Sequence, residues 1–458
     1  MEHILFLTGH LAQPSLLRVL GTLGDAPFSW DVRDIGVQVA ALMTTELIRR
    51  RVERPLLGEG AHRIDRIVLP GRCRGDLAAL TDHFGVPVQR GPEELKDLPA
   101  FFDRAARPVA LDDYRVQIFA EIVDAPRLTI EQIVLRAAQH RADGADVIDI
   151  GCLPETPFGH LAEAVQALKA AGHAVSVDSV DPQELLRGGR AGADYLLSLT
   201  PDTLWLADEV AATPVLIPRV PADEASLQAA IEHLQRLGRP FLADPILDPI
   251  PFGFVASIVR YHRLRERFPT VPIMMGVGNL TELTEADTSG INALLLGMCA
   301  ELDVAAVLTT QVSPHARRAV KEADWARRIM HAARQLGTLP KGLSSALMTV
   351  HARRPFLDTP AEIAATAAQV RDPSFRVQVS PQGLHVYNRD GMRQGPGAFA
   401  LWPQLGLEND AAHAFYMGVE LAHAEIAHKL GKRYVQDQPL DWGCAVEPVP
   451  IPTDGPGQ

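Results

Sequence analysis

The feature that most constrains this chain is a regular alternation of strand-like and helix-like segments between residues 114 and 338. A helix-forming stretch follows each of eight short apolar runs, which indicate strands at 116–122, 146–150, 174–178, 194–199, 214–217, 240–244, 271–277 and 304–309. Such alternation is typical of parallel strands joined by helical crossovers. Eight units in about 225 residues have the size and rhythm of a (β/α)8 TIM barrel. The alternative is a doubly wound open sheet, which is disfavoured because no Gly-x-Gly-x-x-Gly turn follows a first strand.

Several of the predicted helices carry start and stop signals. Thr129-Ile-Glu-Gln132 has the pattern of a capping box. Asp181-Pro-Gln-Glu184 combines an N-cap residue with a proline in the first turn. Gly144-Ala-Asp and Gly192-Ala-Asp end two successive helices in the same way, because glycine readily adopts the left-handed conformation that follows a helix. These signals support the rhythm of strands and helices.

Two further domains and a tail complete the predicted organisation. Residues 1–110 alternate short strands and helices and predict a small N-terminal α/β domain, and the barrel occupies 114–338. Residues 361–446 predict a C-terminal α+β domain, with strands near 375–380, 383–387 and 398–402 and a long helix over 410–430. Residues 447–458 are rich in Pro and Gly and predict a disordered tail.

Composition and charge exclude several classes of function. The 458 residues include 44 basic and 56 acidic side chains, and the net charge of −12 argues against nucleic acid as a partner. Four cysteines without a Cys-x-x-Cys pair indicate neither a zinc ribbon nor a disulfide framework. No apolar run approaches the ~20 residues of a membrane span, and the first residues lack the pattern of a signal peptide. We therefore expect a cytoplasmic protein without a membrane partner.

Polar side chains gather where the predicted barrel strands end, which is where barrels place their active sites. In chain order these positions carry Glu121 with Asp124, Asp149, Asp178, Ser198, Arg219, Asp244 with Asp248, Asn279, and Thr310 with Gln311. A ring of carboxylates can accept paired hydrogen bonds from the guanidine-like edge of a flat heterocycle, and its oxygens also suit Mg²⁺. The alternative is that each aspartate only caps the helix that follows it, which is less expected of four aspartates together.

Four segments at these strand ends form an ordered set. They are Gly144-Ala-Asp-Val-Ile-Asp149-Ile-Gly151, Val175-Ser-Val-Asp178-Ser179, Gly192-Ala-Asp-Tyr-Leu-Leu-Ser198-Leu and Asp248-Pro-Ile-Pro-Phe-Gly253-Phe254. In this order they resemble the pterin-binding barrels, the superfamily of dihydropteroate synthases and methyltetrahydrofolate:corrinoid methyltransferases. Met275-Gly-Val-Gly-Asn279-Leu280 is more similar to the methyltransferase version of the seventh strand. The resemblance covers about half of the chain.

Other segments narrow the resemblance. They are Thr8-Gly-His-Leu-Ala12, Ala40-Ala-Leu-Met-Thr-Thr45, Leu69-Pro-Gly-Arg-Cys-Arg-Gly-Asp76 and Glu282-Leu-Thr-Glu-Ala-Asp287. With them the whole chain resembles the dihydropteroate-synthase-related proteins of methanogens and of methylotrophic bacteria that use tetrahydromethanopterin.

The resemblance implies roles for individual residues. Asp178 and Asp248 match the aspartates that contact the pterin, and Asn279 matches the amide on the seventh strand. Asp244 competes for the role of Asp248, because Asp244 and the proline after it repeat the same dipeptide four residues earlier.

Other positions depart from the family pattern. Ser198 stands where the family usually has Asn, and Asp149 matches a residue that is more often structural. The cationic motifs that hold pyrophosphate in the synthases are absent, and Arg219, His315 and Arg317 are the candidate anion-binding replacements. The alternative for Arg317, together with the arginine after it, is a solvated helix start.

The function implied by the resemblance is that of a pterin-binding transferase in tetrahydromethanopterin biosynthesis. It would join an activated hydroxymethyl-dihydropterin to an arylamine, ribofuranosyl-aminobenzene phosphate, with help from Mg²⁺ or an arginine as diphosphate leaves. Two alternatives are methyl transfer between a methylated pterin and a corrinoid, and a non-catalytic pterin carrier or assembly factor in one-carbon metabolism. The expected cofactor is a dihydropterin or tetrahydromethanopterin, and corrinoid enters only under the first alternative. Catalytic residues and metal ligands are left unassigned, and a homodimer is expected because barrels of this superfamily are often dimers.

Overall fold

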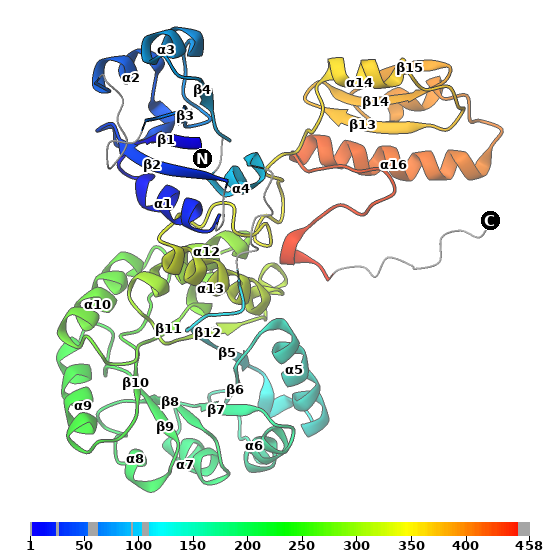
Figure 1. Ribbon diagram of the computed structural model, residues 1–458. Helices are drawn as coiled ribbons and strands as arrows, with labels where there is room; N and C mark the ends of the chain where they lie inside the picture. Colours follow the sequence, from blue (N-terminus) through cyan, green and yellow to red (C-terminus); the bar gives the residue numbers. More distant parts are fainter. Residues whose placement is uncertain (1, 24–26, 54–62, 93–94, 103–109, 448–458) are drawn as a thin grey trace. The chain divides into compact units, whose positions relative to one another are not determined.

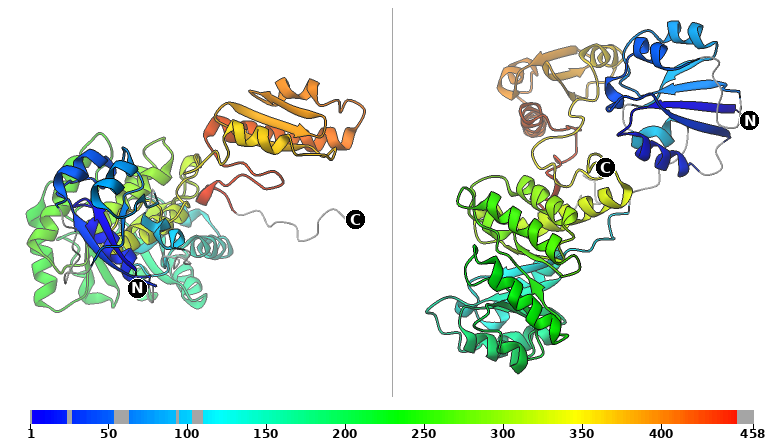
Figure 2. Two further views of the ribbon diagram at one scale, coloured as in Figure 1. Left: turned by 45° about the horizontal axis from the view of Figure 1, so that its top comes forward. Right: turned by 90° about the vertical axis from the view of Figure 1, so that its left-hand side faces the viewer.

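The computed structural model describes residues 2–23, 27–53, 63–92, 95–102 and 110–447 of the chain. Contacts divide the chain into two units. One comprises Met1–Asp113 with His331–Leu343, and the other comprises Tyr114–Met330 with Ser344–Gln458. Figures 1 and 2 show the helices and strands of both.

The N-terminal unit is built on a four-stranded parallel sheet in the order β2-β1-β3-β4. Its strands are β1 (Glu2–Thr8), β2 (Phe28–Asp34), β3 (Arg66–Leu69) and β4 (Val88–Arg90), and its helices are α1 (Gln13–Gly21), α2 (Thr45–Arg51), α3 (Leu77–Phe84) and α4 (Leu98–Phe101). Successive residues of β1 point to opposite faces, so Ile4 and Phe6 join one core while Leu5 and Leu7 join another. Helices cover both faces, as a parallel sheet requires.

The second unit contains the predicted barrel, which the structure confirms. Eight parallel strands pair in the order β10-β9-β8-β7-β6-β5-β12-β11 (Figure 1). They are β5 (Gln117–Ile122), β6 (Val147–Gly151), β7 (Ala174–Asp178), β8 (Tyr195–Leu199), β9 (Thr213–Leu216), β10 (Leu242–Ala243), β11 (Met274–Gly276) and β12 (Ala306–Thr310). A parallel bridge between Ala243 and Ile273 links the two end strands, so the sheet is nearly closed.

Helices surround the strands on the outside of this ring. They are α5 (Ile130–Asp143), α6 (Leu161–Ala170), α7 (Pro182–Arg190), α8 (Leu206–Glu209), α9 (Glu224–Arg236), α10 (Phe254–Arg267), α11 (Gly278–Thr281), α12 (Thr288–Glu301) and α13 (Ala319–Leu336). The capping box predicted at Thr129 forms with both of its hydrogen bonds, and Asp181 accepts a hydrogen bond from the Gln183 amide. The start signals in the sequence therefore act as predicted.

Side-chain alternation separates two cores in the barrel and places the mouth residues. Phe119, Val147 and Leu197 belong to a small cluster inside the barrel, whereas their sequence neighbours pack between the strands and the helices. Side chains two positions further along a strand point the same way. Glu121 follows Phe119 by two residues and Asp149 follows Val147 by two, so both reach the inner side at the carboxyl end of the barrel.

The C-terminal part of this unit is a three-stranded antiparallel sheet with helices. Its elements are α14 (Pro360–Ala367), β13 (Arg376–Ser380), β14 (Gly383–Asn388), β15 (Gly391–Gly395), α15 (Ala398–Leu401) and α16 (Ala411–Leu430). The strand predicted at 398–402 is wrong, because that segment forms α15. The third strand begins at Gly391, which has a φ of +111° and pairs with Asn388 across the two-residue Arg389-Asp390 turn. The predicted tail, apart from its first residue, lies outside the described residues.

None of the helices in the described part of the chain combines the length and the apolar character that crossing a membrane requires.

Candidate functional site at the barrel mouth

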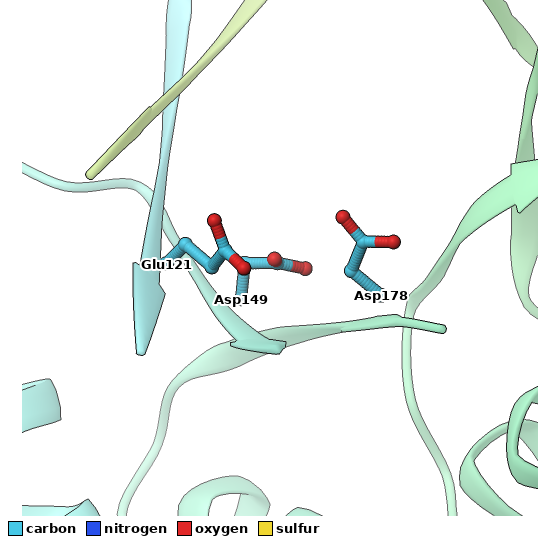
Figure 3. A group of neighbouring side chains, drawn as sticks. All are labelled: Glu121, Asp149 and Asp178. Atoms are coloured by element: carbon cyan, nitrogen blue, oxygen red, sulfur yellow. The ribbon is translucent and has the colours of Figure 1, made fainter. Parts of the chain in front are cut away.

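Three carboxylates from neighbouring strands converge at the mouth of the barrel. Glu121 lies near the end of β5, Asp149 on β6 and Asp178 at the end of β7. One carboxylate oxygen of each lies within 4.8 Å of the others. Figure 3 shows the carboxylates of Glu121 and Asp149 side by side and that of Asp178 opposite them. The parallel register explains this convergence, since Glu121 pairs with Asp149 and Gly151 pairs with Asp178. We call these three residues the carboxylate trio.

Asp149 is the most enclosed member of the trio. Its side chain is 0% exposed, and the Ser176 hydroxyl donates a hydrogen bond to Oδ1 at 2.5 Å. Its second oxygen, Oδ2, is buried without a hydrogen-bond partner among the described residues. A buried carboxylate oxygen without a partner is uncommon in folded proteins, because it has lost water and gained nothing in return.

Gly151 makes room for the trio. A Cβ atom on Gly151 would lie 2.5 Å from Glu121 Oε1, which is closer than real Cβ atoms come to a neighbour. The absence of a side chain at this position therefore lets the Glu121 carboxylate lie over β6 and reach Asp149.

Burial and mutual repulsion raise the pKa values of the trio. Burial, followed by the charges of Asp178 and Glu282, raises the pKa of Glu121 to about 7. Burial and the charge of Asp244 raise the pKa of Asp178 to about 7, and burial also raises the pKa of Asp149. The three oxygens lie within 4.8 Å of one another, and two full charges at that distance repel by roughly 3 kcal/mol at an effective dielectric constant of about 20. Near neutral pH the trio therefore favours a proton, a cation or an N–H donor.

Asp244 extends this acidic surface from β10. The Tyr261 hydroxyl and the Ile246 amide donate hydrogen bonds to its Oδ1 at 2.6 and 2.7 Å. Burial raises the pKa of Asp244 to about 6, although these two hydrogen bonds and the charge of Arg260 oppose the rise. Both hydrogen bonds use one oxygen, so Oδ2 is the atom best able to accept from a ligand.

Asp248 and Asn279 hold the loop that follows β10. The buried Arg260 donates to Asp248 Oδ2 at 2.7 Å. The Asn279 side chain donates to the Leu247 carbonyl at 2.7 Å. Gly253 closes the same loop, because a Cβ there would lie 2.9 Å from Asp248 Oδ2. Through these contacts Asp248 and Asn279 fix the loop that lies beside Asp244.

Ser198 lies in an irregularity of β8. The register with β9 shifts between Leu197 and Leu199, and Ser198 is the residue between them. Leu197 packs inside the barrel while Leu199 packs towards the helices. Ser198 itself is half-buried.

The predicted anion-binding side chains contact other groups. Arg219 pairs with Asp202 at 3.2 Å and is exposed. The His315 ring lies 3.1 Å from the Thr281 carbonyl through Nε2, and Arg317 is exposed at the end of a short helix. The structure brings Asp149, Asp178 and Asp244 together at the mouth, and it does not place these three cations in contact with them.

Two residues outside the predicted site also contribute. Glu282 accepts hydrogen bonds from Thr310 Oγ1, the Val312 amide and the Ser313 amide at 3.1, 2.8 and 2.9 Å. Burial acts to raise its pKa, but these hydrogen bonds together lower it. Tyr261 is fully buried and comes from the middle of α10. The position of Glu282 shortly after Asn279 was a weak signal in the sequence, whereas Tyr261 had none.

Comparisons with known proteins match different parts of the chain. A family model described as "Family of unknown function (DUF6513)" matches residues 2–93. The "Uncharacterized protein MJ0107" of Methanocaldococcus jannaschii is 25% identical, over 95% of this chain and 98% of that protein.

Similar solved structures cover about half of the chain and include dihydropteroate synthases. The Yersinia pestis dihydropteroate synthase with a pterine–sulfa conjugate is 19% identical, covering 49% of this chain and 95% of that one, with a TM-score of 0.37. The Xanthomonas albilineans dihydropteroate synthase in complex with 7,8-dihydropteroate is 20% identical, covering 49% and 94%, with a TM-score of 0.38.

Proposed function

We propose that this chain is a pterin-dependent transferase whose pterin binds at the mouth of the barrel. The observation that carries the proposal is the pair of carboxylates Asp178 and Asp244, which lie close enough for the charge of one to raise the pKa of the other. The guanidine-like edge of a pterin offers adjacent N–H donors, and carboxylates accept such donors in pairs. The ordered motifs that resemble pterin-binding barrels support the same ligand.

In this proposal the residues of the loop after β10 position the side of the binding site that contacts the pterin. Arg260 and Asp248 hold the loop through an ion pair of 2.7 Å, and Asn279 anchors it at the Leu247 carbonyl. Their contribution is therefore to the orientation of Asp244 and of the ligand against it. Side chains held by such contacts keep a bound ligand in one geometry, and holding the reactants in the right geometry lowers the barrier of the reaction.

The reaction we propose is the joining of an activated hydroxymethyl-dihydropterin to an arylamine, in tetrahydromethanopterin biosynthesis. The amine would attack the methylene carbon as diphosphate leaves, so the enzyme must orient both substrates and stabilise the charge on the leaving group. The narrower sequence resemblance to proteins of organisms that use tetrahydromethanopterin supports this reaction.

Methyl transfer between a methylated pterin and a corrinoid is the second candidate. Arg219 is paired with Asp202, and Arg260 is paired with Asp248. Arginines that are already paired with carboxylates are poorly placed to bind a diphosphate leaving group. Methyl transfer releases no diphosphate and does not need such cations. The similarity of the Asn279 turn to the methyltransferase version points the same way.

Pterin binding is the first experiment. Isothermal calorimetry with a 7,8-dihydropterin should give binding to the wild-type chain, and Asp178→Asn and Asp244→Asn should each weaken it by roughly 1.5–3 kcal/mol, the range of hydrogen bonds to charged groups. Asp202→Asn is the matched control, because that carboxylate is exposed and pairs with Arg219. A wild-type chain that does not bind, or two variants that bind as tightly as the wild type, would refute the proposal.

The reaction is tested next with each pair of substrates. Release of pyrophosphate from hydroxymethyl-dihydropterin diphosphate in the presence of ribofuranosyl-aminobenzene phosphate supports the condensation. A change in corrinoid absorbance with a methylated pterin supports methyl transfer instead. Tight pterin binding with neither reaction would identify a carrier and contradict a transferase.

A further inference from the structure

The carboxylate trio holds more negative charge than its own protein contacts balance. Asp149 receives a hydrogen bond from Ser176, but its fully buried Oδ2 has no partner in the described part of the chain. Figure 3 shows the Asp149 carboxylate directed between those of Glu121 and Asp178. A fully buried carboxylate that keeps one oxygen unpartnered and is directed between two further carboxylates favours a positively charged ligand at this place.

We propose that Glu121, Asp149 and Asp178 together bind one divalent metal ion of the Mg²⁺ and Mn²⁺ class. Each residue contributes one oxygen, and the three oxygens lie within 4.8 Å of one another. In an octahedral Mg²⁺ site with bonds of about 2.1 Å, three ligands on one side are neighbours and their oxygens lie roughly 3.0 Å apart. Binding of the ion would therefore draw the three oxygens of the trio closer together by rotation of their side chains.

The donor set determines the kind of metal. The trio offers only carboxylate oxygens, which are hard ligands that favour Mg²⁺ and Mn²⁺ over the softer ions held by sulfur or imidazole. Mg²⁺ usually keeps several water molecules and takes few protein ligands, so three carboxylates on one side are a sufficient set. The remaining positions would face the mouth, where water or an anionic group of a substrate could occupy them.

Gly151 leaves the space that the Glu121 carboxylate of the trio occupies. A Cβ atom at this position would lie 2.5 Å from Glu121 Oε1 and 3.1 Å from the Val123 backbone. Alanine at Gly151 would therefore displace the Glu121 carboxylate without changing any charge. This gives a way to test geometry separately from electrostatics.

A metal ion would add positive charge at the trio that the predicted anion-binding side chains do not bring to it. The candidate cations Arg219 and His315 contact Asp202 and the Thr281 carbonyl, respectively. A metal ion on the trio would place positive charge beside the pterin position proposed for Asp178. The metal site does not rest on the proposed function, because it can be measured on the chain without pterin.

The experiment is a titration of the full chain, freed of metals with EDTA, with Mn²⁺ followed by electron paramagnetic resonance. The wild type should bind one Mn²⁺ per chain, and added Mg²⁺ should displace it. Glu121→Gln and Asp149→Asn should weaken binding at least tenfold, and Gly151→Ala should weaken it although the charge is unchanged. Glu163→Gln is the matched control, because Glu163 is an exposed carboxylate on α6 of the same barrel.

Two results would overturn the metal site. One is a wild type that binds no Mn²⁺ at pH 7, and an infrared carbonyl band of a protonated carboxyl would then show that the trio holds a proton instead. The other is binding of equal strength in Glu121→Gln and the wild type, because the ion then lies elsewhere. Circular dichroism establishes that each variant is folded, and the half-buried Glu121 keeps the test valid if Asp149→Asn does not fold. Pterin binding is measured in parallel, and a chain that binds pterin but no Mn²⁺ would show that only the metal site is wrong.

Discussion

Asp244 is a single residue whose burial should make the stability of the protein depend on pH. Burial raises its pKa from an ordinary 3.8 to about 6, even though Tyr261 and the Ile246 amide donate to it. Between these two values the folded chain binds more protons at this site than the unfolded chain. Stability therefore falls as pH rises through this range, and above pH 6 the full cost of the buried charge is present.

Asp244→Asn should remove this cost. An amide keeps an oxygen that can accept from Tyr261 but cannot ionise. The difference in unfolding free energy between the variant and the wild type should grow in favour of the variant by on the order of 1–3 kcal/mol from pH 4 to pH 8, since each unit of pKa shift corresponds to about 1.4 kcal/mol. Urea unfolding in EDTA at both pH values measures the gain. A difference between variant and wild type that does not change with pH would contradict this account.

Much of the site at this scale could be predicted from sequence, because residues at the ends of parallel strands share one edge. Asp149, Asp178 and Asp244 follow this rule. The sequence places the end of the strand at Asp244, and β10 ends one residue earlier at Ala243, but the sequence did not reveal which of the two Asp-Pro dipeptides supplies the ligand-facing carboxylate. The hydrogen bond from Tyr261 and the space over Gly151 depend on side chains from other elements, which no local pattern records.

At the scale of elements, Arg327 joins α13 to the amino ends of two barrel strands. Its guanidinium donates to the Val116 carbonyl at 2.7 Å and the Gly144 carbonyl at 2.8 Å, and it pairs with Asp146 and Asp324. The side chain is almost fully buried. One residue thus satisfies two carbonyls and two carboxylates at the end of the barrel opposite the mouth.

Arg327→Ala should destabilise the barrel by about 3–5 kcal/mol, because the buried Asp324 and the half-buried Asp146 lose a buried ion-pair partner and two backbone carbonyls lose their donor. Arg136→Ala is the matched control, since Arg136 forms an exposed ion pair with Asp124 and such pairs contribute about 1 kcal/mol or less. Thermal unfolding of the two variants measures the contrast. Equal losses would mean that the buried network adds nothing beyond an ordinary surface pair.

Gly144 follows α5 and Gly192 follows α7, both in the left-handed conformation, but they meet different surroundings. Their φ angles are +113° and +104°, so alanine at either position is strained. A Cβ on Gly144 would lie 2.5 Å from Asp324 Cγ, whereas a Cβ on Gly192 would have nothing within 4 Å. Gly192→Ala should cost about 1–2 kcal/mol from the backbone alone. Gly144→Ala should cost clearly more, and chemical denaturation of the pair would contradict this if the two losses were the same.

The elements of the barrel were easier to predict than those of the C-terminal part for a physical reason. Eight repeats of one pattern, several of them with caps and left-handed glycines, reinforce one another along the chain. The β14–β15 hairpin depends on a single Arg389-Asp390 turn, whereas the sequence pattern predicts the third strand in the apolar segment after β15. That segment is helical where the Glu425 carboxylate accepts from the Ala398 amide, a contact across 27 residues of sequence.

At the scale of the whole molecule, the division into two units should be visible in calorimetry. The N-terminal sheet has its own cores, which include Ile67 and Phe6, and the barrel has separate clusters inside and outside its strands. Because each unit buries its own apolar side chains, we expect two unfolding transitions. Ile67→Ala, at a fully buried position, should lower only the N-terminal transition, by about 2–5 kcal/mol, and so assign it.

The metal site predicts which of these transitions responds to Mg²⁺. A ligand that binds only the folded barrel at 100 times its dissociation constant adds about 2.7 kcal/mol to the unfolding free energy of the barrel. For a unit of this size the gain corresponds to several degrees in Tm. Mg²⁺ should therefore raise the barrel transition of the wild type and of Glu163→Gln, and should leave that of Glu121→Gln unchanged. If Mg²⁺ moved both transitions together, or moved the barrel transition of Glu121→Gln as much as that of the wild type, the stabilisation would come from general screening of the net charge of −12 and not from the trio.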